Sequence, residues 1–219
     1  MKASFIRKTL VFALAALLCA LSLASCKATL KPGENGLYDS QNKISYSHAS
    51  TVYEATALVK EYGKLAVTDK ESYALYTVPG MDPTEMLATE DYNIVYAQGV
   101  AMPTLAEMAP TVLHICVDGS DTVREVHKME DAVAIAALVH DFTTGKNLSY
   151  PAKSPLRSYT ARFESTQYPG FYYSLTYVEY AEDVEIDGVS YGRYFLRSAF
   201  EGIFIPVGDE IHKSMGLAD

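Results

Sequence analysis

Residues 171–186 read FYYSLTYVEYAEDVEI, a long run rich in aromatic and β-branched side chains. This composition is typical of a β-strand. Similar runs lie before and after it along the chain, at 157–165, 189–197 and 202–208. Consecutive strands with few helices between them favour an antiparallel sheet over a doubly wound parallel one.

The clearest helix signal precedes these strands, in MEDAVAIAALVHDF at residues 129–142. Its apolar residues recur at helical spacing, and Gly145 follows as a stop signal. Short helices are expected at 82–90, where Asp82 is the N-cap, and near 209–215. The sequence therefore predicts an α+β fold with a mostly antiparallel sheet, one clear helix at about 129–142, and short helices.

Residues 51–62, TVYEATALVKEY, fit two predictions. Thr51 and Glu54 form a capping box for a helix, whereas apolar residues from Tyr53 to Val59 alternate as in a strand. Both alternatives stay open from the sequence alone. Further strands are expected at 71–80, 92–98, 111–118 and 122–128.

The segment GVSYG at residues 188–192 has the G-x-S-x-G spelling of a hydrolase nucleophile elbow, with Ser190 as the nucleophile. A catalytic triad would then need His212, the sole histidine after Ser190, and Asp209. An elbow requires a strand that turns into a helix, followed by further strand and helix units. Little chain remains for such units after Ser190, so the match is weak.

A hairpin is the stronger interpretation of the same segment, because Asp187-Gly188 is among the strongest two-residue turn signals. Such a turn fixes the register of the two strands and makes Ser190 an ordinary strand residue. The expected pairs are Ile186 with Val189, Glu185 with Ser190, Val184 with Tyr191, and Glu182 with Arg193.

The first 26 residues indicate export from the cytoplasm. Lys2, Arg7 and Lys8 precede an apolar run without any charge at residues 10–24. This run is short for a membrane span and has the length of a signal-peptide core. It leads into L-A-S-C at residues 23–26, which resembles the lipobox of bacterial lipoprotein precursors. The resemblance implies that lipid is attached to the thiol of Cys26 and that cleavage makes Cys26 the acylated N-terminus.

This resemblance divides the chain into a signal peptide (1–25), a lipidated tether (26–36) and a single extracytoplasmic α+β domain (37–219). The tether is predicted from KATLKPGENG, which is polar, contains Pro32 and has no periodicity. Two or three acyl chains on one cysteine form a durable anchor. We therefore expect a protein that is held at the bacterial cell membrane by lipid on Cys26 and does not cross it.

The charge balance makes nucleic acid an unexpected partner. The whole chain has a formal net charge of −9, and residues 1–25 carry three of its 18 basic residues and none of its 27 acidic ones. The remaining chain is therefore three charges more negative, at −12. An acidic chain without a basic stripe repels phosphate backbones.

Cysteine usage excludes a disulfide within the folded domain. Cys19 lies in the signal peptide and Cys26 is the expected anchor, which leaves Cys116 alone. The strand-like surroundings of Cys116 predict a buried thiol rather than a nucleophile activated by His114.

Other motifs are weak, and no catalytic residue, cofactor site or metal ligand is predicted. Asp183, Glu185 and Asp187 start like a calcium loop, but Tyr194 stands where a glutamate is needed. Residues 40–43 match the S-x-x-K of penicillin-binding enzymes without the K-T-G or S-D-N that should follow. Five histidines without an H-x-x-x-H pair are typical of surface histidines: His48, His114, His127, His140 and His212.

The expected function is that of a membrane-anchored extracytoplasmic lipoprotein with a non-catalytic domain that binds a small ligand or another envelope protein. Its organisation is similar to that of small bacterial lipoproteins of uncharacterised function. Two alternatives are a secreted serine hydrolase that uses Ser190 and a cell-surface inhibitor or immunity protein.

Overall fold

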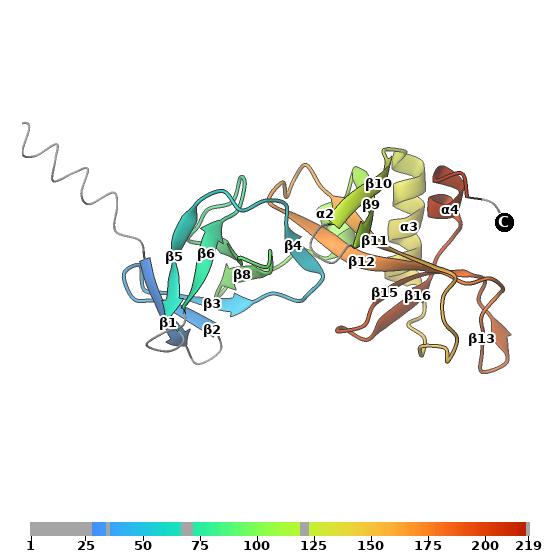
Figure 1. Cartoon of the computed structure of the whole chain (residues 1–219), viewed down its shortest axis with the longest axis horizontal. Coiled ribbons are helices and arrows are strands. Elements are labelled where there is room, and N and C mark those ends of the chain that lie inside the picture. Colours follow the sequence, from blue (N-terminus) through green and yellow to red (C-terminus); the bar gives the residue numbers. More distant parts are fainter. Residues whose placement is uncertain (1–27, 34–35, 67–71, 119–122, 218–219) are drawn as a thin grey trace, which may run out of the picture.

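The computed structural model describes residues 28–33, 36–66, 72–118 and 123–217. The first part of the chain forms a closed barrel, and the rest forms a sheet covered by helices (Figure 1). The barrel and the sheet lie side by side along the long axis of the molecule (Figure 1). None of the helices in the described ranges has the length and apolar character needed to cross a membrane.

Seven strands make up the barrel, and neighbouring strands are antiparallel except at the point of closure. There β1 and β5 run parallel, with Leu30 opposite Leu65. Buried apolar side chains fill the interior, among them Tyr46 and Leu87. In spatial order the strands are β1 (Ala28–Gly33), β2 (Gly36–Asp39), β3 (Ile44–His48), β8 (Ile94–Ala97), β7 (Met86–Thr89), β6 (Ser72–Thr77) and β5 (Glu61–Ala66).

The predicted tether of residues 26–36 differs from the structure, because residues 28–33 are strand β1 of the barrel. Leu30 is fully buried, and β1 pairs with both β2 and β5. Pro32 fits within the strand although it has no backbone N–H to donate. The folded part therefore begins at or before Ala28 rather than at Leu37.

Asp39 fixes the turn between β2 and β3. Its buried carboxylate accepts hydrogen bonds from Gln41 N (2.9 Å), Asn42 N (3.1 Å), Asn42 Nδ2 (2.8 Å) and the Tyr62 hydroxyl (2.7 Å). Burial by itself raises the pKa of Asp39, but these four hydrogen bonds together outweigh burial and hold the pKa below its ordinary value. The turn is thus bound to β5, which carries Tyr62.

The second sheet has seven strands, and all of its pairings are antiparallel. The short strand β4 comes from the middle of the barrel sequence and pairs with the first residues of β12. In spatial order the others are β10 (Val123–Met129), β9 (Val112–Asp118), β11 (Arg157–Glu164), β12 (Phe171–Glu179), β15 (Tyr194–Ser198) and β16 (Ile203–Pro206), with β4 at Tyr53–Ala55.

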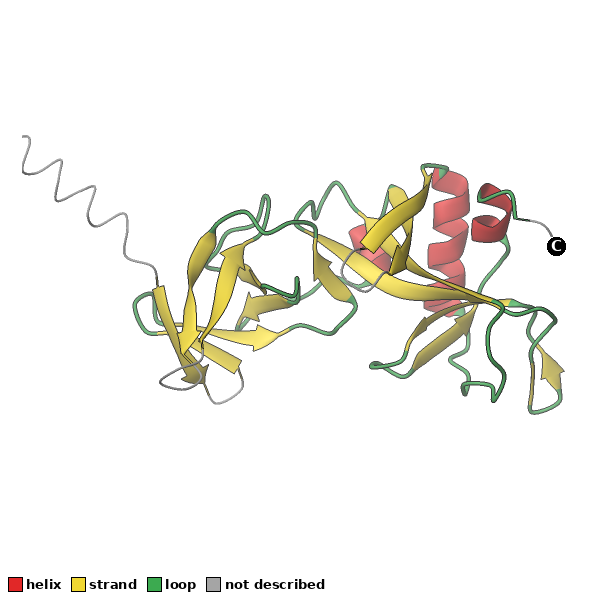
Figure 2. Ribbon diagram, viewed as in Figure 1, coloured by secondary structure: helices red, strands yellow, loops and turns green. Residues whose placement is uncertain are grey.

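Three helices, α2 (Leu105–Met108), α3 (Ala132–Thr144) and α4 (Glu210–Ser214), cover one face of this sheet (Figure 2). Helix α3 begins after Asp131, whose carboxylate accepts hydrogen bonds from Val133 N (2.9 Å) and Ala134 N (3.2 Å). The helices predicted at about 129–142 and near 209–215 are confirmed, as is the α+β class. The barrel was not predicted, and its parallel closure means that the sheets are not simply antiparallel.

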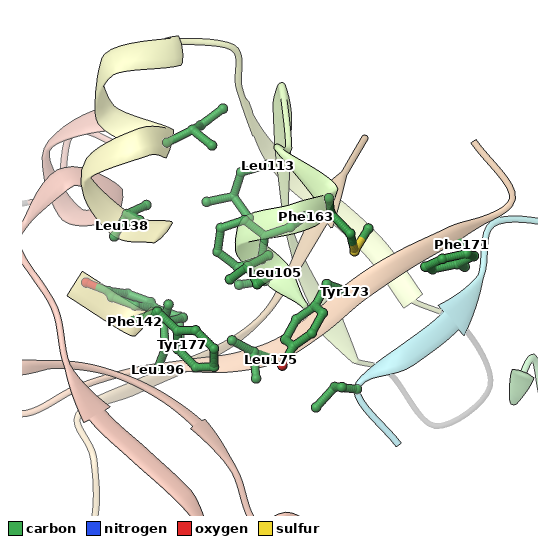
Figure 3. Close-up of a cluster of buried hydrophobic side chains, with 14 of the residues drawn as sticks. Leu105, Leu113, Leu138, Phe142, Phe163, Phe171, Tyr173, Leu175, Tyr177 and Leu196 are labelled. Carbon is green, nitrogen blue, oxygen red and sulfur yellow. The ribbon is translucent and has the colours of Figure 1, made fainter. Parts of the chain in front are cut away.

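One apolar core joins the barrel to the sheet, and Figure 3 shows the part of this core that lies between the sheet and the helices. Strands β7 and β8 are buried on both faces: Leu87 and Val95 fill the barrel, whereas Met86, Ala88 and Ile94 pack in the core of the sheet. On the sheet side, this core includes the apolar face of α3 and most of the buried side chains of β9, β11 and β12. The barrel and the sheet therefore share buried surface and are held together by it.

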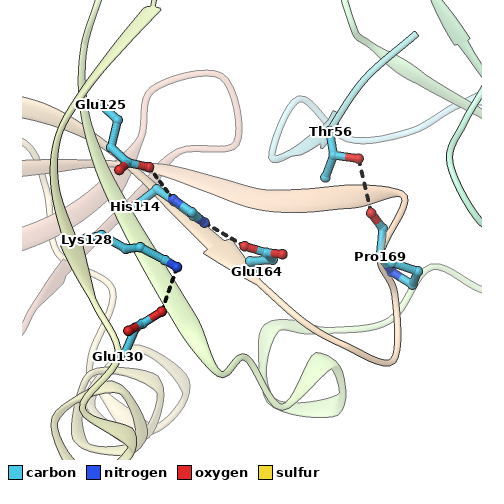
Figure 4. A network of polar contacts seen from close by, with 7 residues as sticks. All are labelled: Thr56, His114, Glu125, Lys128, Glu130, Glu164 and Pro169. Atoms are coloured by element: carbon cyan, nitrogen blue, oxygen red, sulfur yellow. Dashed lines mark hydrogen bonds and ion pairs between the residues drawn. The ribbon is translucent and has the colours of Figure 1, made fainter. Parts of the chain in front are cut away.

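The turn before β12 adds a close contact at the same junction. Thr56 N donates to Gly170 O (3.0 Å) and Thr56 Oγ1 donates to Pro169 O (3.1 Å), as Figure 4 shows for the latter. A Cβ atom at Gly170 would lie 2.7 Å from Pro79 O and 2.5 Å from Met81 Cγ. Only glycine allows the two segments to approach this closely.

Two local predictions are settled or corrected by long-range packing. The helix expected at 82–90 is wrong: Asp82 makes a cap-like contact with Thr84 N (2.8 Å), but only a turn forms and β7 follows. Burial of consecutive residues between the barrel interior and the sheet overrides the local helix signal. Between residues 51 and 62 the helix alternative is wrong, and the strand alternative holds for Tyr53–Ala55 (β4), while β5 starts at Glu61; Glu54 does not act in a capping box.

The predicted hairpin is confirmed at its turn. Strands β13 (Glu185–Ile186) and β14 (Val189–Ser190) pair as expected, Glu185 with Ser190 and Ile186 with Val189. Asp187 and Gly188 both have positive φ, 52° and 75°, as a type I′ turn requires.

The register changes further from the turn. Tyr191 N donates to Val184 O (3.0 Å), but Val184 N donates to Gly192 O (2.8 Å), so the second strand contains an extra residue. The predicted pairing of Glu182 with Arg193 is therefore wrong. Arg193 O instead accepts from Tyr180 N (2.9 Å), and the Glu182 carboxylate lies 3.4 Å from Lys153 Nζ.

Replacing Asp39 with asparagine is expected to lower the free energy of unfolding at neutral pH by about 1–3 kcal/mol. The new amide nitrogen would face two donors, the Asn42 amide and the Tyr62 hydroxyl. Because the folded-state pKa of Asp39 lies below the unfolded value, its contribution is present above about pH 4 and is lost as pH falls through the folded pKa. Urea denaturation at neutral and acid pH measures this, with Asp91→Asn, in an exposed turn, as the control. A difference between wild type and Asp39→Asn that grows on acidification would contradict the assignment.

Candidate functional site

The two faces of the sheet differ in character because successive side chains along a strand point to opposite faces. On β12 the apolar set that packs in the shared core is Phe171, Tyr173, Leu175 and Tyr177. The polar set on the opposite face is Tyr172, Ser174 and Thr176. Neighbouring strands add Thr160 opposite Thr176 and Arg162 opposite Ser174. Hydroxyl and charged groups are thus collected on the face that the helices do not cover.

A groove with a volume of about 490 Å³ crosses this polar face. Its floor is formed by β11, β12 and β15, and it extends from Glu54 and Asn93 near the barrel to the turn after β15. Thr51 Oγ1 donates to Glu201 Oε1 (3.3 Å), which links the segment before β4 to that turn. The volume lies in the range of small-molecule sites.

Arg162 and Glu54 form a two-bond ion pair in this groove. Arg162 Nε donates to Glu54 Oε2 (2.8 Å), and Arg162 Nη2 donates to Glu54 Oε1. Both side chains are largely shielded from solvent, and the guanidinium carbon lies 5.6 Å from the centre of the Tyr172 ring. The planar guanidinium matches the carboxylate in this geometry. Glu54 therefore neutralises Arg162 and fixes its position.

A second carboxylate in the groove has acceptor capacity left. Thr160 Oγ1 donates to Asp118 Oδ2 at 2.7 Å. A carboxylate has about four acceptor positions on its two oxygens, and among the described residues this contact uses one of them. Asp118 can therefore accept further hydrogen bonds from a molecule in the groove.

Arg197 is the other cation of the groove. It lies opposite Thr176 on β15, so that Thr160, Thr176 and Arg197 form one row across three adjacent strands. Within the described ranges, its side chain makes no ion pair and no hydrogen bond. Burial raises the pKa of Tyr150, and the positive charge of Arg197 acts in the opposite direction. Arg197 lines the groove together with the hydroxyl groups of Thr160 and Thr176, and its charge has no ion-pair partner among the described residues.

The turn after β15 supplies an apolar rim. Phe200 lines the groove and is 88% exposed, the most exposed large apolar side chain of the described residues. An exposed aromatic ring beside polar groups offers a flat surface for contact with a ligand.

His114, on the same polar face, lies between two carboxylates (Figure 4). Its Nδ1 is 2.5 Å from Glu125 Oε2 and its Nε2 is 2.6 Å from Glu164 Oε2. Each ring nitrogen thus contacts a different carboxylate. The Tyr172 ring packs edge-on against it at 5.6 Å. This histidine binds β9 to both of its neighbours, β10 and β11, and is not the ordinary surface histidine that the sequence suggested.

The serine hydrolase constellation does not assemble. Ser190 lies on β14, where its Oγ donates to Asp183 Oδ2 (3.3 Å). His212 is buried on the helix side of the sheet, with Nδ1 3.3 Å from Glu179 Oε2, and Asp209 pairs with Lys213 Nζ (2.8 Å). The other oxygen of Glu179 accepts from Arg157 Nη1 (2.8 Å). His212, Glu179 and Arg157 therefore form a network on the helix side of the sheet, away from the groove, and Ser190 is not part of it.

Cys116 is a buried free thiol, as predicted. Burial raises the pKa of this thiol, and the charge of Arg162 partly opposes the effect. Both ring nitrogens of neighbouring His114 are engaged by carboxylates, so no base activates the sulfur.

The remaining motif residues have local roles. Ser40 and Lys43 lie exposed in the turn between β2 and β3, and Asp183, Glu185 and Asp187 belong to the hairpin. Among the described residues, no group of three or more histidine, cysteine, aspartate or glutamate side chains is placed to hold a metal ion. Cys26 and the lipobox lie outside the described residues.

The groove residues were missed from the sequence because they come from distant segments. Glu54 and Arg162 are 108 positions apart, and their pairing depends on β4 joining the second sheet. One signal was present: polar residues alternate with apolar ones along 157–165 and 171–177, which marks one face of each strand as solvated.

Comparison with known proteins gives no relative: no family model, no curated protein and no solved structure matches this chain.

We expect His114→Gln to lower the free energy of unfolding by about 1 kcal/mol, because the amide nitrogen can replace only one of the two ring nitrogens that contact partly exposed carboxylates. Chemical denaturation measures the change, and His140→Gln, at an exposed position of α3, serves as the control. Equal stability of His114→Gln and wild type would show that the two contacts contribute nothing.

Proposed function

We propose that this protein is a membrane-anchored extracytoplasmic lipoprotein whose sheet binds a small polar ligand in the groove on its uncovered face. The groove carries this proposal, because it combines the volume of a small-molecule site with side chains of fixed position. Arg162 is held by Glu54, and Thr160 by Asp118, so these groups do not have to be ordered when a ligand arrives.

The chemistry of the groove suits binding rather than nucleophilic catalysis. In the described residues, its lining contains neither a histidine nor a cysteine, and Ser174 and Thr176 have no adjacent base. Hydroxyl groups, one free guanidinium and one carboxylate provide hydrogen bonds that would fix the orientation of a bound molecule. The groove also favours a small ligand over the inhibitor or immunity function, which would use a broader surface.

The position of strand β1 determines how close the proposed anchor would hold the barrel to the membrane. Strand β1 begins at Ala28, two residues after Cys26. A lipid on Cys26 would therefore hold the barrel within about 10 Å of the membrane surface, since an extended chain spans about 3.3–3.6 Å per residue. In this arrangement the barrel acts as the spacer between the membrane and the binding sheet, in place of the predicted flexible tether.

The anchor is tested by metabolic labelling with a palmitate analogue in a bacterial host. We expect the label and the protein in the membrane fraction, and loss of both in Cys26→Ala because no thiol remains to be acylated. Cys19→Ala, within the predicted signal peptide, is the control and should keep both. Label retained by Cys26→Ala would contradict the proposal.

The groove is tested by a thermal-shift screen of the full chain in detergent against neutral sugars, sugar acids, amino acids, carboxylic acids and nucleosides. A ligand that binds only the folded state raises the melting temperature. At least one polar compound should do so for wild type and not for Thr176→Trp, in which an indole occupies the groove floor. Thr111→Trp, at an exposed position outside the groove, should respond as wild type does. A screen without any compound that distinguishes Thr176→Trp from wild type would overturn the binding function.

A further inference from the structure

The charges in the groove define the class of ligand, on the premise that the groove is a binding site as proposed above. Arg162 is neutralised by Glu54 through two hydrogen bonds. Arg197 has no such partner within the described ranges, yet it lies on the groove floor and is partly buried. The free positive charge is therefore that of Arg197, at one end of the row of hydroxyl groups.

A guanidinium group presents paired N–H donors in one plane, and a carboxylate accepts them through two parallel bonds. The pair of Arg162 and Glu54 shows this geometry in the same groove. A ligand carboxylate at Arg197 would repeat it. An ammonium group would find repulsion at this end of the row instead.

The rest of the row is suited to hydroxyl groups. Thr160, Thr176 and Arg197 occupy adjacent strands, which lie about 4.8 Å apart, so the row spans roughly 10 Å. Thr176 and Ser174 have side-chain hydroxyls without a partner in the described part of the chain, and each can donate or accept. Asp118, at the far end, accepts hydrogen bonds only, which fits the hydroxyl of a ligand and not a second carboxylate.

Phe200, three residues after Arg197 in the chain, adds a flat apolar surface at the rim of the groove. The carbon-bound hydrogens of a sugar ring form an apolar face of matching size, and such a face packs against aromatic rings. A flexible polar chain would gain less from this contact.

We infer that the groove binds a small hydroxylated carboxylic acid with a ring, of which a uronic acid is the simplest representative. The carboxylate pairs with Arg197, ring hydroxyls bond to Thr176, Ser174 and Asp118, and one face of the ring lies against Phe200.

Isothermal titration calorimetry of the full chain in detergent tests this with glucuronate and galacturonate as probes and glucose and acetate as comparisons. At least one uronate should bind more tightly than glucose and acetate. Arg197→Gln should weaken uronate binding about 10- to 100-fold, because a hydrogen bond to a charged group is lost. The neutral sugar should be affected little by this change. Arg124→Gln, on strand β10 outside the groove, is the matched control and should bind as wild type does.

The outcomes test the inferred ligand class and the binding function of the groove separately. Uronate binding that survives in Arg197→Gln, or glucose that binds as tightly as the uronates, overturns the inferred class and leaves the groove function standing. Absence of uronate binding at millimolar concentration also overturns the inferred class, and the screen with Thr176→Trp then decides whether the groove binds another polar compound. Thermal denaturation of Arg197→Gln is the control for folding, so that weaker binding is not mistaken for loss of the folded state.

Discussion

The packing of Met86, Ala88 and Ile94 against the sheet is the contact on which the other features depend. These residues belong to barrel strands whose alternate side chains fill the barrel, so β7 and β8 are buried on both faces. Complete burial of an apolar side chain contributes about 1.5–3 kcal/mol, and several such side chains meet here. This core holds the barrel against the sheet. Strand β4, which lies between barrel strands β3 and β5 in the sequence, can therefore reach β12 and pair with it. That pairing carries Glu54 to Arg162 and gives the groove its wall on the barrel side.

In the described part of the chain, the polar face of the sheet combines the ion-paired charges of Arg162 and Glu54 with Arg197, a cation without an ion-pair partner. Breaking a shielded ion pair such as that of Arg162 and Glu54 leaves a charge without its partner, which is costly, whereas the pair itself contributes modestly to stability. Its value for a binding site is that Glu54 fixes and neutralises Arg162, so that this guanidinium does not compete for the ligand. Arg197 has no such partner in the described part of the chain, and its place on β15 fixes its position at the groove. A site in which most groups are prearranged loses little entropy on binding, so a few contacts can give useful affinity.

The sequence predicted features whose signals are local. Asp187-Gly188 placed the hairpin, and the apolar spacing that ends in Phe142 placed helix α3, because turn geometry and helix amphipathicity are encoded within a few residues. The barrel, β4 and β7 depend on contacts between distant segments, so residues 82–90 carried a helix signal although they form a turn and a strand. Of the groove, only the polar alternation along β11 and β12 could be predicted. The pairing of Glu54 with Arg162 and the isolation of Arg197 required the strand order.

A crystal structure of the protein with bound glucuronate tests most directly whether Arg197 binds the carboxylate of a ligand in the groove. We expect a carboxylate within hydrogen-bond distance of the Arg197 guanidinium, ring hydroxyls beside Thr176 and Asp118, and the pair of Arg162 and Glu54 unchanged. A ligand bound elsewhere on the molecule, or one that displaces Glu54 from Arg162 while Arg197 remains without contact, would contradict it.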